Sequence, residues 1–188
     1  MSKVAIVYHS GYGHTAEIAK AVARGAAQVS GVTVQSISVA DADKHWDDLA
    51  AVDAIIFGAP TYMGSASAPF KVFADASSKV WFTQGWKDKI AAGFTHSGSI
   101  NGDKYSTINQ MFTLAMQHSM VWVGLGLMPG NNSSKGSAED LNRMGSFTGL
   151  MTQSNVDQGA EAIPASDLKT AEHLGRRVAQ FALARPRA

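Results

Sequence analysis

The sequence contains no cysteine among its 188 residues. Disulfide bonds, thiol nucleophiles, iron–sulfur clusters and cysteine-ligated zinc are therefore excluded, and the composition is compatible with a reducing compartment. The net charge is also small, because 16 Lys and Arg balance 15 Asp and Glu to a formal charge of +1. This balance provides no field that attracts nucleic acid or an acidic membrane surface. The longest apolar run, residues 120–128, contains two glycines and is too short to span a bilayer. We expect a soluble protein of the cytoplasm.

Several catalytic motifs are also missing. The six histidines show no H-E-x-x-H or similar spacing, which argues against a zinc site. The sequence has no G-x-x-x-x-G-K-[ST] loop and no G-x-S-x-G elbow. A P-loop nucleotidase and an α/β-hydrolase are therefore both disfavoured.

Short apolar runs alternate with segments of helical periodicity along the whole chain. Runs of strand length and composition occupy residues 4–8, 32–37, 52–57, 90–94 and 120–123. Helices are expected from about residue 15 to 29 and over residues 69–81, 105–118 and 168–183. This order predicts one doubly wound α/β domain over residues 1–188, with a five-stranded parallel sheet and helices on both faces. Residues 124–164 are predicted to form a long functional or mobile loop, followed by a helix that Ser166 caps.

The loop after the first strand has the composition of a phosphate site. It consists of Ser10, Gly11, Tyr12, Gly13, His14 and Thr15. The glycines permit close backbone approach, the following helix directs free N–H groups at the loop, and the two hydroxyls can donate to phosphate oxygens. The alternative is a strand-to-helix turn that needs glycine only for its geometry.

Two further loops are expected at the same edge of the sheet, because ligands of open α/β sheets bind beyond the carboxyl ends of the strands. A flat heterocycle can pack on Tyr62 or Met63, while polar loop groups meet its edges. The alternative is that Tyr62 and Met63 only cover the sheet. The candidate residues after the third strand are Pro60, Thr61, Tyr62, Met63 and Gly64, and those after the fourth are Thr95, His96, Ser97, Gly98, Ser99 and Gly102.

The first loop also matches a dinucleotide fingerprint. Residues 11–16 read G-x-G-x-x-A, the motif that binds the pyrophosphate of NAD in Rossmann domains. That site needs an acidic residue at the end of the second strand, and the nearest candidates, Asp41 and Asp43, come late. An NAD-type site is therefore the minority interpretation.

Taken together, the three loops and the segment 114–121 resemble the flavodoxin-like NAD(P)H:quinone oxidoreductases of the WrbA type. The resemblance covers nearly the whole chain in order, and its most specific element is the Tyr12-Gly13-His14 triplet. It implies FMN, with the phosphate at residues 10–15 and the isoalloxazine between the loops at 61–64 and 95–102. It further implies that His118 lies near the ring and that Trp81 lies near the catalytic pocket of a neighbouring subunit.

An enzyme and an electron carrier both fit this fold. An enzyme would pass electrons from NAD(P)H to a quinone or similar acceptor, whereas carrier flavodoxins are typically strongly acidic, unlike this near-neutral chain. A non-catalytic FMN-binding protein is a third alternative. The aromatic cluster Trp81, Phe82 and Trp86 indicates a subunit contact in a homodimer or homotetramer, the alternative being that these rings cap the monomer core.

Overall fold

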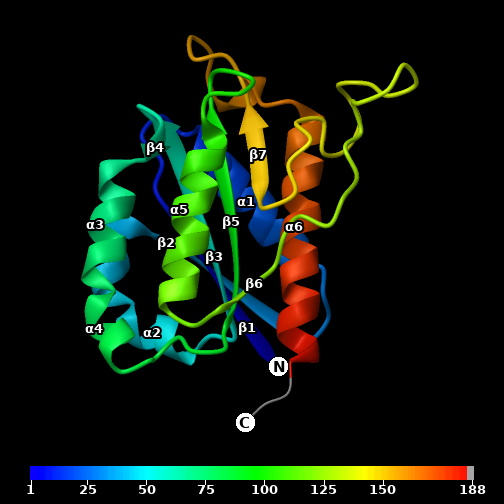
Figure 1. Ribbon diagram of the computed structural model, residues 1–188. Helices are drawn as coiled ribbons and strands as arrows, with labels where there is room; N and C mark the ends of the chain where they lie inside the picture. The colour runs from blue at the N-terminus through cyan, green and yellow to red at the C-terminus, as the bar shows by residue number, and fades with distance from the viewer. Residues whose placement is uncertain (186–188) are drawn as a thin grey trace.

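The computed structural model describes residues 1–185 as a parallel sheet between two layers of helices (Figure 1). The strands follow the order β2-β1-β3-β5-β6, while β4 pairs with β3 and β7 pairs with β5. All pairings are parallel except that of β3 with β4. The predicted doubly wound fold with a five-stranded parallel core is confirmed. The strands are β1 Ser2–Tyr8, β2 Val32–Ser38, β3 Ala54–Tyr62, β4 Ser65–Ala66, β5 Ile90–Ser97, β6 Val121–Trp122 and β7 Leu150–Gln153.

The helices divide between the two faces of the sheet. Helices α1 and α6 pack on one face, and α2, α3 and α5 pack on the other. Within residues 1–185 no helix is long and apolar enough to cross a membrane. The helices are α1 His14–Ala27, α2 Trp46–Ala51, α3 Ala68–Ala76, α4 Ser78–Phe82, α5 Lys104–Gln117 and α6 Ala165–Ala184, with 3₁₀ helices η1 Val39–Lys44 and η2 Ala160–Ala162.

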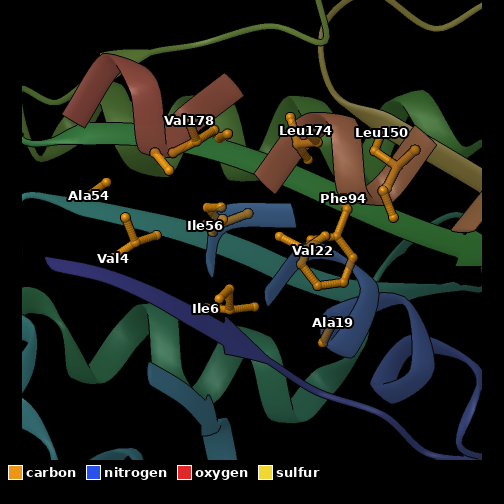
Figure 2. Packing of buried hydrophobic residues seen from close by; sticks show 14 of the residues in the cluster. Val4, Ile6, Ala19, Val22, Ala54, Ile56, Phe94, Leu150, Leu174 and Val178 are labelled. Atoms are coloured by element: carbon orange, nitrogen blue, oxygen red, sulfur yellow. The ribbon is translucent and has the colours of Figure 1, made fainter. Parts of the chain in front are cut away.

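The central strands are apolar throughout because both of their faces are buried. In β1, Val4 and Ile6 point toward α1 and α6, while Ala5 and Val7 point toward the opposite helices. Figure 2 shows the first of these layers, with Val22 of α1 beside the strands. Alternate side chains of the strand point to opposite faces, and both faces are buried. The sequence therefore shows a continuous apolar run rather than an alternation of apolar and polar residues.

Two strands extend beyond their predicted ends. The sequence places Gly58 and Pro60 after the third strand, but β3 continues to Tyr62, and β5 continues from Phe94 to Ser97. Gly58 is required by packing, since a Cβ there would lie 2.1 Å from the Phe94 ring. The candidate residues up to Tyr62 and Ser97 therefore lie on rigid strand ends and not on loops.

The fifth position of the sheet is built from two separate pieces. Val121 and Trp122 pair with Ile90 and Ala91, and Leu150 then resumes the pairing opposite Phe94. Residues 123–149 leave the sheet between these pieces. The predicted loop over residues 124–164 thus contains a strand that the sequence analysis missed.

Two predicted helix boundaries need correction. The helix expected over residues 69–81 is broken at Ser77 into α3 and α4. The last helix begins at Ala165 after Pro164, so Ser166 lies inside its first turn. The Ser166 hydroxyl donates to the Ala138 carbonyl instead of capping the helix.

The aromatic cluster does not form one surface patch. Trp86 is fully buried and packs among Trp46, Phe57 and Phe73. Trp81 and Phe82 are 48% and 82% exposed. Trp86 therefore belongs to the core, and only Trp81 and Phe82 remain available for a subunit contact.

Candidate functional site

A cavity of the described chain lies beyond the carboxyl ends of β1, β3, β5 and β7. Its volume is about 370 Å³, within the range of small-molecule sites. Its position is the one expected for a ligand of an open parallel sheet. It is lined by Ser10, Tyr12, His14, Thr15, Pro60, Thr61, Tyr62, His96, Ser97, Gly98, Ser154 and Val156.

The loop after β1 has free donors at the start of α1. Ser10 Oγ accepts hydrogen bonds from the amides of Gly13 and Ala16, each at 3.1 Å. Gly13 has a φ of 93°, which places it in the left-handed region that glycine favours. The amides of His14 and Thr15 have no partner within residues 1–185. Helix N-termini with free amides bind anions, and the hydroxyl protons of Ser10 and Thr15 add two donors at this point.

Two tyrosines form one wall of the cavity. Tyr12 and Tyr62 meet edge to face with ring centroids 6.3 Å apart. The Tyr62 hydroxyl lies so close to Gly11 that a Cβ there would be 2.7 Å from the oxygen. Burial and the neighbouring Tyr12 raise the pKa of Tyr62, so the Tyr62 phenol stays protonated at ordinary pH. Met63 lies elsewhere, fully exposed at the turn between β3 and β4.

A pair of stacked histidines forms another wall. His14 and His96 are nearly parallel, at 7°, with centroids 5.0 Å apart. The Thr152 hydroxyl donates to the Thr95 carbonyl, so Thr152 Oγ1 accepts the Nδ1–H of His96, at 3.0 Å. His96 Nε2 then accepts from Ser154 Oγ at 3.2 Å. Burial is the main cause that lowers the pKa of His96 to about 3, and this ring stays neutral at ordinary pH.

Behind the cavity, three threonines join the ends of β3, β5 and α5. Thr61 Oγ1 lies 2.8 Å from Thr95 Oγ1 and 2.7 Å from Thr107 Oγ1. Thr95 is completely buried and points away from the cavity because strand residues alternate, which turns His96 toward the cavity. Thr95 therefore supports the cavity without lining it.

Comparison with known proteins identifies the family. Residues 5–84 match the model of the "Flavodoxin domain". The chain is 48% identical over 181 residues to "Flavodoxin FldP" of Pseudomonas aeruginosa, covering 96% of this chain and 97% of that protein. The chain belongs to the flavodoxin family.

Two other similar proteins carry further descriptions. A solved structure of a "flavodoxin, WrbA-like protein" from Agrobacterium tumefaciens matches this flavodoxin-family chain with a TM-score of 0.75 and 42% identity, covering 97% and 98% of the two chains. An "NAD(P)H dehydrogenase (quinone)" of Acidithiobacillus ferrooxidans is 28% identical, covering 96% and 97%. The similar proteins therefore include both a named flavodoxin and a named quinone dehydrogenase.

Most of the predicted binding residues gather at one place. The structure brings ten of them to the cavity wall, and Gly11 and Gly13 shape its first loop. Met63, Gly64, Thr95, Ser99 and Gly102 do not line it.

The sequence analysis missed the contribution of the segment after β7. Ser154 and Val156 line the cavity, and the Gln158 carbonyl lies 3.1 Å from His14 Nε2. This segment was missed because β7 was not recognised. A polar pair, Ser154 and Asn155, does follow the apolar pair Leu150 and Met151 within a few residues, and that was the available signal.

His118 and Trp81 lie away from this cavity, although the family resemblance implies that His118 lies near the flavin ring. Both line a separate hollow of about 450 Å³, here called the Trp81 hollow, with Phe82, Gln84, Gln117 and Ser119. The reason is helix direction: α5 starts near the cavity and returns antiparallel to β5. Its 14 residues carry the chain about 20 Å away before His118.

His118 is held in the core beneath this hollow. Its ring lies 4.4 Å from the Trp86 ring. The Ser77 hydroxyl donates to the Ala74 carbonyl, so Ser77 Oγ accepts the Nε2–H of His118, at 2.8 Å. Burial lowers the pKa of His118 to about 4, and no partner for Nδ1 is found within residues 1–185.

We predict that the free energy of unfolding falls by about 1–2 kcal/mol between pH 7 and pH 5 because of His118. The unfolded histidine binds a proton near pH 6.5 and the folded one only near pH 4, so acid favours the unfolded chain in this window. Urea unfolding at both pH values measures the slope, and His118→Asn should reduce it. An unchanged slope in that variant would assign the pH dependence to other groups, with buried His96 the first to test.

Proposed function

We propose that the cavity binds FMN and that the chain, as a single FMN-binding domain, is an oxidoreductase of the cytoplasm. The observation that carries the proposal is the free donor set at the start of α1, which suits one terminal phosphate. The amides of His14 and Thr15 lack partners within the described chain, and Ser10 and Thr15 add hydroxyls. The uncharged walls of Tyr62 and His96 suit a flat heterocycle.

When bound, FMN supplies two-electron chemistry, and we propose that NAD(P)H is the electron donor and a quinone-like small molecule the acceptor. The amides of His14 and Thr15 and the hydroxyls of Ser10 and Thr15 would hold the phosphate, and other hydroxyl and amide groups of the lining would be available to the polar edge of the ring. The neutral His96 ring at the cavity wall suits an uncharged acceptor. The quinone dehydrogenase among the similar proteins supports this choice.

The second candidate is a single-electron carrier. It is favoured by the name of the 48% identical protein, "Flavodoxin FldP". The formal charge of +1 favours the enzyme, because an acidic surface is what steers carriers to basic partners.

An anaerobic titration separates the two candidates. The purified holoprotein is mixed with NADH, then with NADPH, and the flavin absorbance is followed, after which benzoquinone is added. Rapid loss of the flavin absorbance with NADH or NADPH, and its recovery when benzoquinone is added, support the enzyme. Bleaching only by dithionite would contradict it and favour the carrier.

We further propose that the chain forms a homodimer or homotetramer in which the Trp81 hollow meets the cavity of a neighbouring copy. Half-exposed Trp81 and exposed Phe82 provide an apolar rim for such a contact. In this arrangement Trp81 and His118 serve the neighbour's flavin and not their own.

We predict that Trp81→Ala slows reoxidation of the reduced protein by benzoquinone at least tenfold, about 1.4 kcal/mol of barrier. The melting temperature should hold because the side chain is half exposed. Val72→Ala, an exposed apolar position on α3, is the matched control. Light scattering that finds a monomer at high concentration, or an unchanged rate in Trp81→Ala, would contradict the shared site.

A further inference from the structure

Lys104 is a buried cation directly behind the cavity wall. It is the first residue of α5 and only 1% exposed. Its Nζ donates to Ser97 Oγ at 2.9 Å and to the Ser99 carbonyl. Ser97 lines the cavity, so one hydroxyl separates the ammonium group from the space that a ligand would occupy.

The charge of Lys104 is not balanced by an adjacent carboxylate. Within residues 1–185 it forms no ion pair, and the acidic group that acts on it is Asp167. Asp167 is itself held by Arg143, whose Nε and Nη2 each donate at 2.8 Å. The three charges together leave one net positive charge behind the wall, and burial lowers the pKa of Lys104 to about 8. A buried ammonium without an adjacent counter-ion is costly to desolvate.

The local backbone holds this arrangement tightly. Asp103 and Gly102 have positive φ values of 52° and 57°, which turn the chain into α5. A Cβ at Gly102 would lie 2.2 Å from Ser97 Oγ, so only glycine permits this loop to close on Ser97. Within this loop, the hydrogen bonds from Nζ to Ser97 and Ser99 hold the ammonium group behind the cavity wall.

We propose that Lys104 is a positioning residue that acts through Ser97 to stabilise the anionic reduced form of bound FMN over its oxidised form. The inference rests on the proposed function. Two electrons and one proton, delivered together as the hydride of NAD(P)H, leave oxidised FMN as an anion and release NAD(P)⁺. A fixed positive charge behind the wall interacts with this new negative charge and only weakly with the neutral oxidised ring.

The test compares the affinity of the apoprotein for oxidised and for chemically reduced FMN under anaerobic conditions. Lys104→Met keeps the length of the side chain and removes its charge. We expect its affinity for reduced FMN to fall at least tenfold more than its affinity for oxidised FMN, which lowers the two-electron midpoint potential by about 30 mV. Lys104→Arg, which keeps the charge, should retain most of the wild-type ratio between the affinities for reduced and oxidised FMN.

Lys89 provides a matched control at the opposite end of β5. It is also a buried lysine, its pKa is lowered by burial, and its Nζ donates to the carbonyls of Ala50 and Val52. Lys89→Met should leave the ratio of the two affinities unchanged.

Equal losses of affinity for both forms of FMN in Lys104→Met, or the same shift in Lys89→Met, would overturn the proposal. If Lys104→Met does not fold, as judged by circular dichroism, the ratio measured on Lys104→Gln decides in the same way. An apoprotein that binds neither form of FMN would overturn the proposed function itself, an outcome distinct from binding with an unchanged ratio.

Discussion

Replacing both Ser10 and Thr15 with Ala is expected to weaken FMN binding by about 2–4 kcal/mol, roughly 30- to 1,000-fold. Each hydroxyl can give one charge-assisted hydrogen bond to a phosphate, worth about 1.5–3 kcal/mol, and the two effects are not fully additive. The amides of His14 and Thr15 remain in the variant, so binding is weakened and not abolished. Fluorescence titration of the apoprotein with FMN measures the loss.

The control for this variant must account for a second role of Ser10. Its hydroxyl oxygen also accepts the amides of Gly13 and Ala16, so Ser10→Ala removes a helix cap at a cost of about 0.5–2 kcal/mol. Ser38 caps η1 in a similar way by accepting the Ala40 amide, and it does not line the cavity. A Ser38→Ala and Thr33→Ala double variant should keep full FMN affinity. Unchanged affinity in the Ser10 and Thr15 variant, or FAD in the released cofactor by mass spectrometry, would contradict the phosphate site.

Trp86→Ala is expected to lower the free energy of unfolding by about 3–5 kcal/mol. The indole is fully buried, and its ring centroid lies 4.4 Å from that of His118 and 6.2–6.3 Å from those of Phe73, Trp46 and Phe57. Its removal leaves a cavity that these rigid rings cannot fill. Trp86 Nε1 has no partner within residues 1–185, which places the loss toward the lower end of the range.

Phe82→Ala provides the contrast, because its ring is 82% exposed only four residues before Trp86. A change within about 0.5 kcal/mol is expected there. Urea unfolding at low protein concentration measures both variants. A loss below 1 kcal/mol for Trp86→Ala would contradict the buried position of the ring in the monomer core.

The fold was predictable because the central strands carry their signal in composition alone. Residues 4–8 and 90–94 are buried on both faces, so each shows an uninterrupted apolar run. The strand β7 carries no such signal, since two of its four residues, Thr152 and Gln153, are polar and a long excursion separates it from β6. Its pairing partner, β5, lies more than 50 residues earlier, and local patterns contain no information about so distant a contact.

The candidate site was predictable at the level of loops but not of side-chain direction. The sequence identified the segments after β1, β3 and β5 because glycine and hydroxyl residues gather there. Whether Thr95 or His96 faces the cavity depends on strand register, which could not be fixed while β5 was taken to end at Phe94. His118 was assigned to the site by family resemblance, although the direction of α5 takes it to the other end of the sheet.

The division of the fifth strand has a consequence for self-association. A long, straight outer strand offers unpaired N–H and C=O groups to other chains and invites sheet-to-sheet aggregation. On the β5 side of the described sheet, the outer position consists of the two-residue β6 and the four-residue β7, and residues 123–149 interrupt the row between them. The opposite side ends in β2, a continuous strand of seven residues. Any strand-mediated aggregation of this protein should therefore begin at β2. At the opposite edge, β6 and β7 are each too short to pair with a strand of another chain over a useful length.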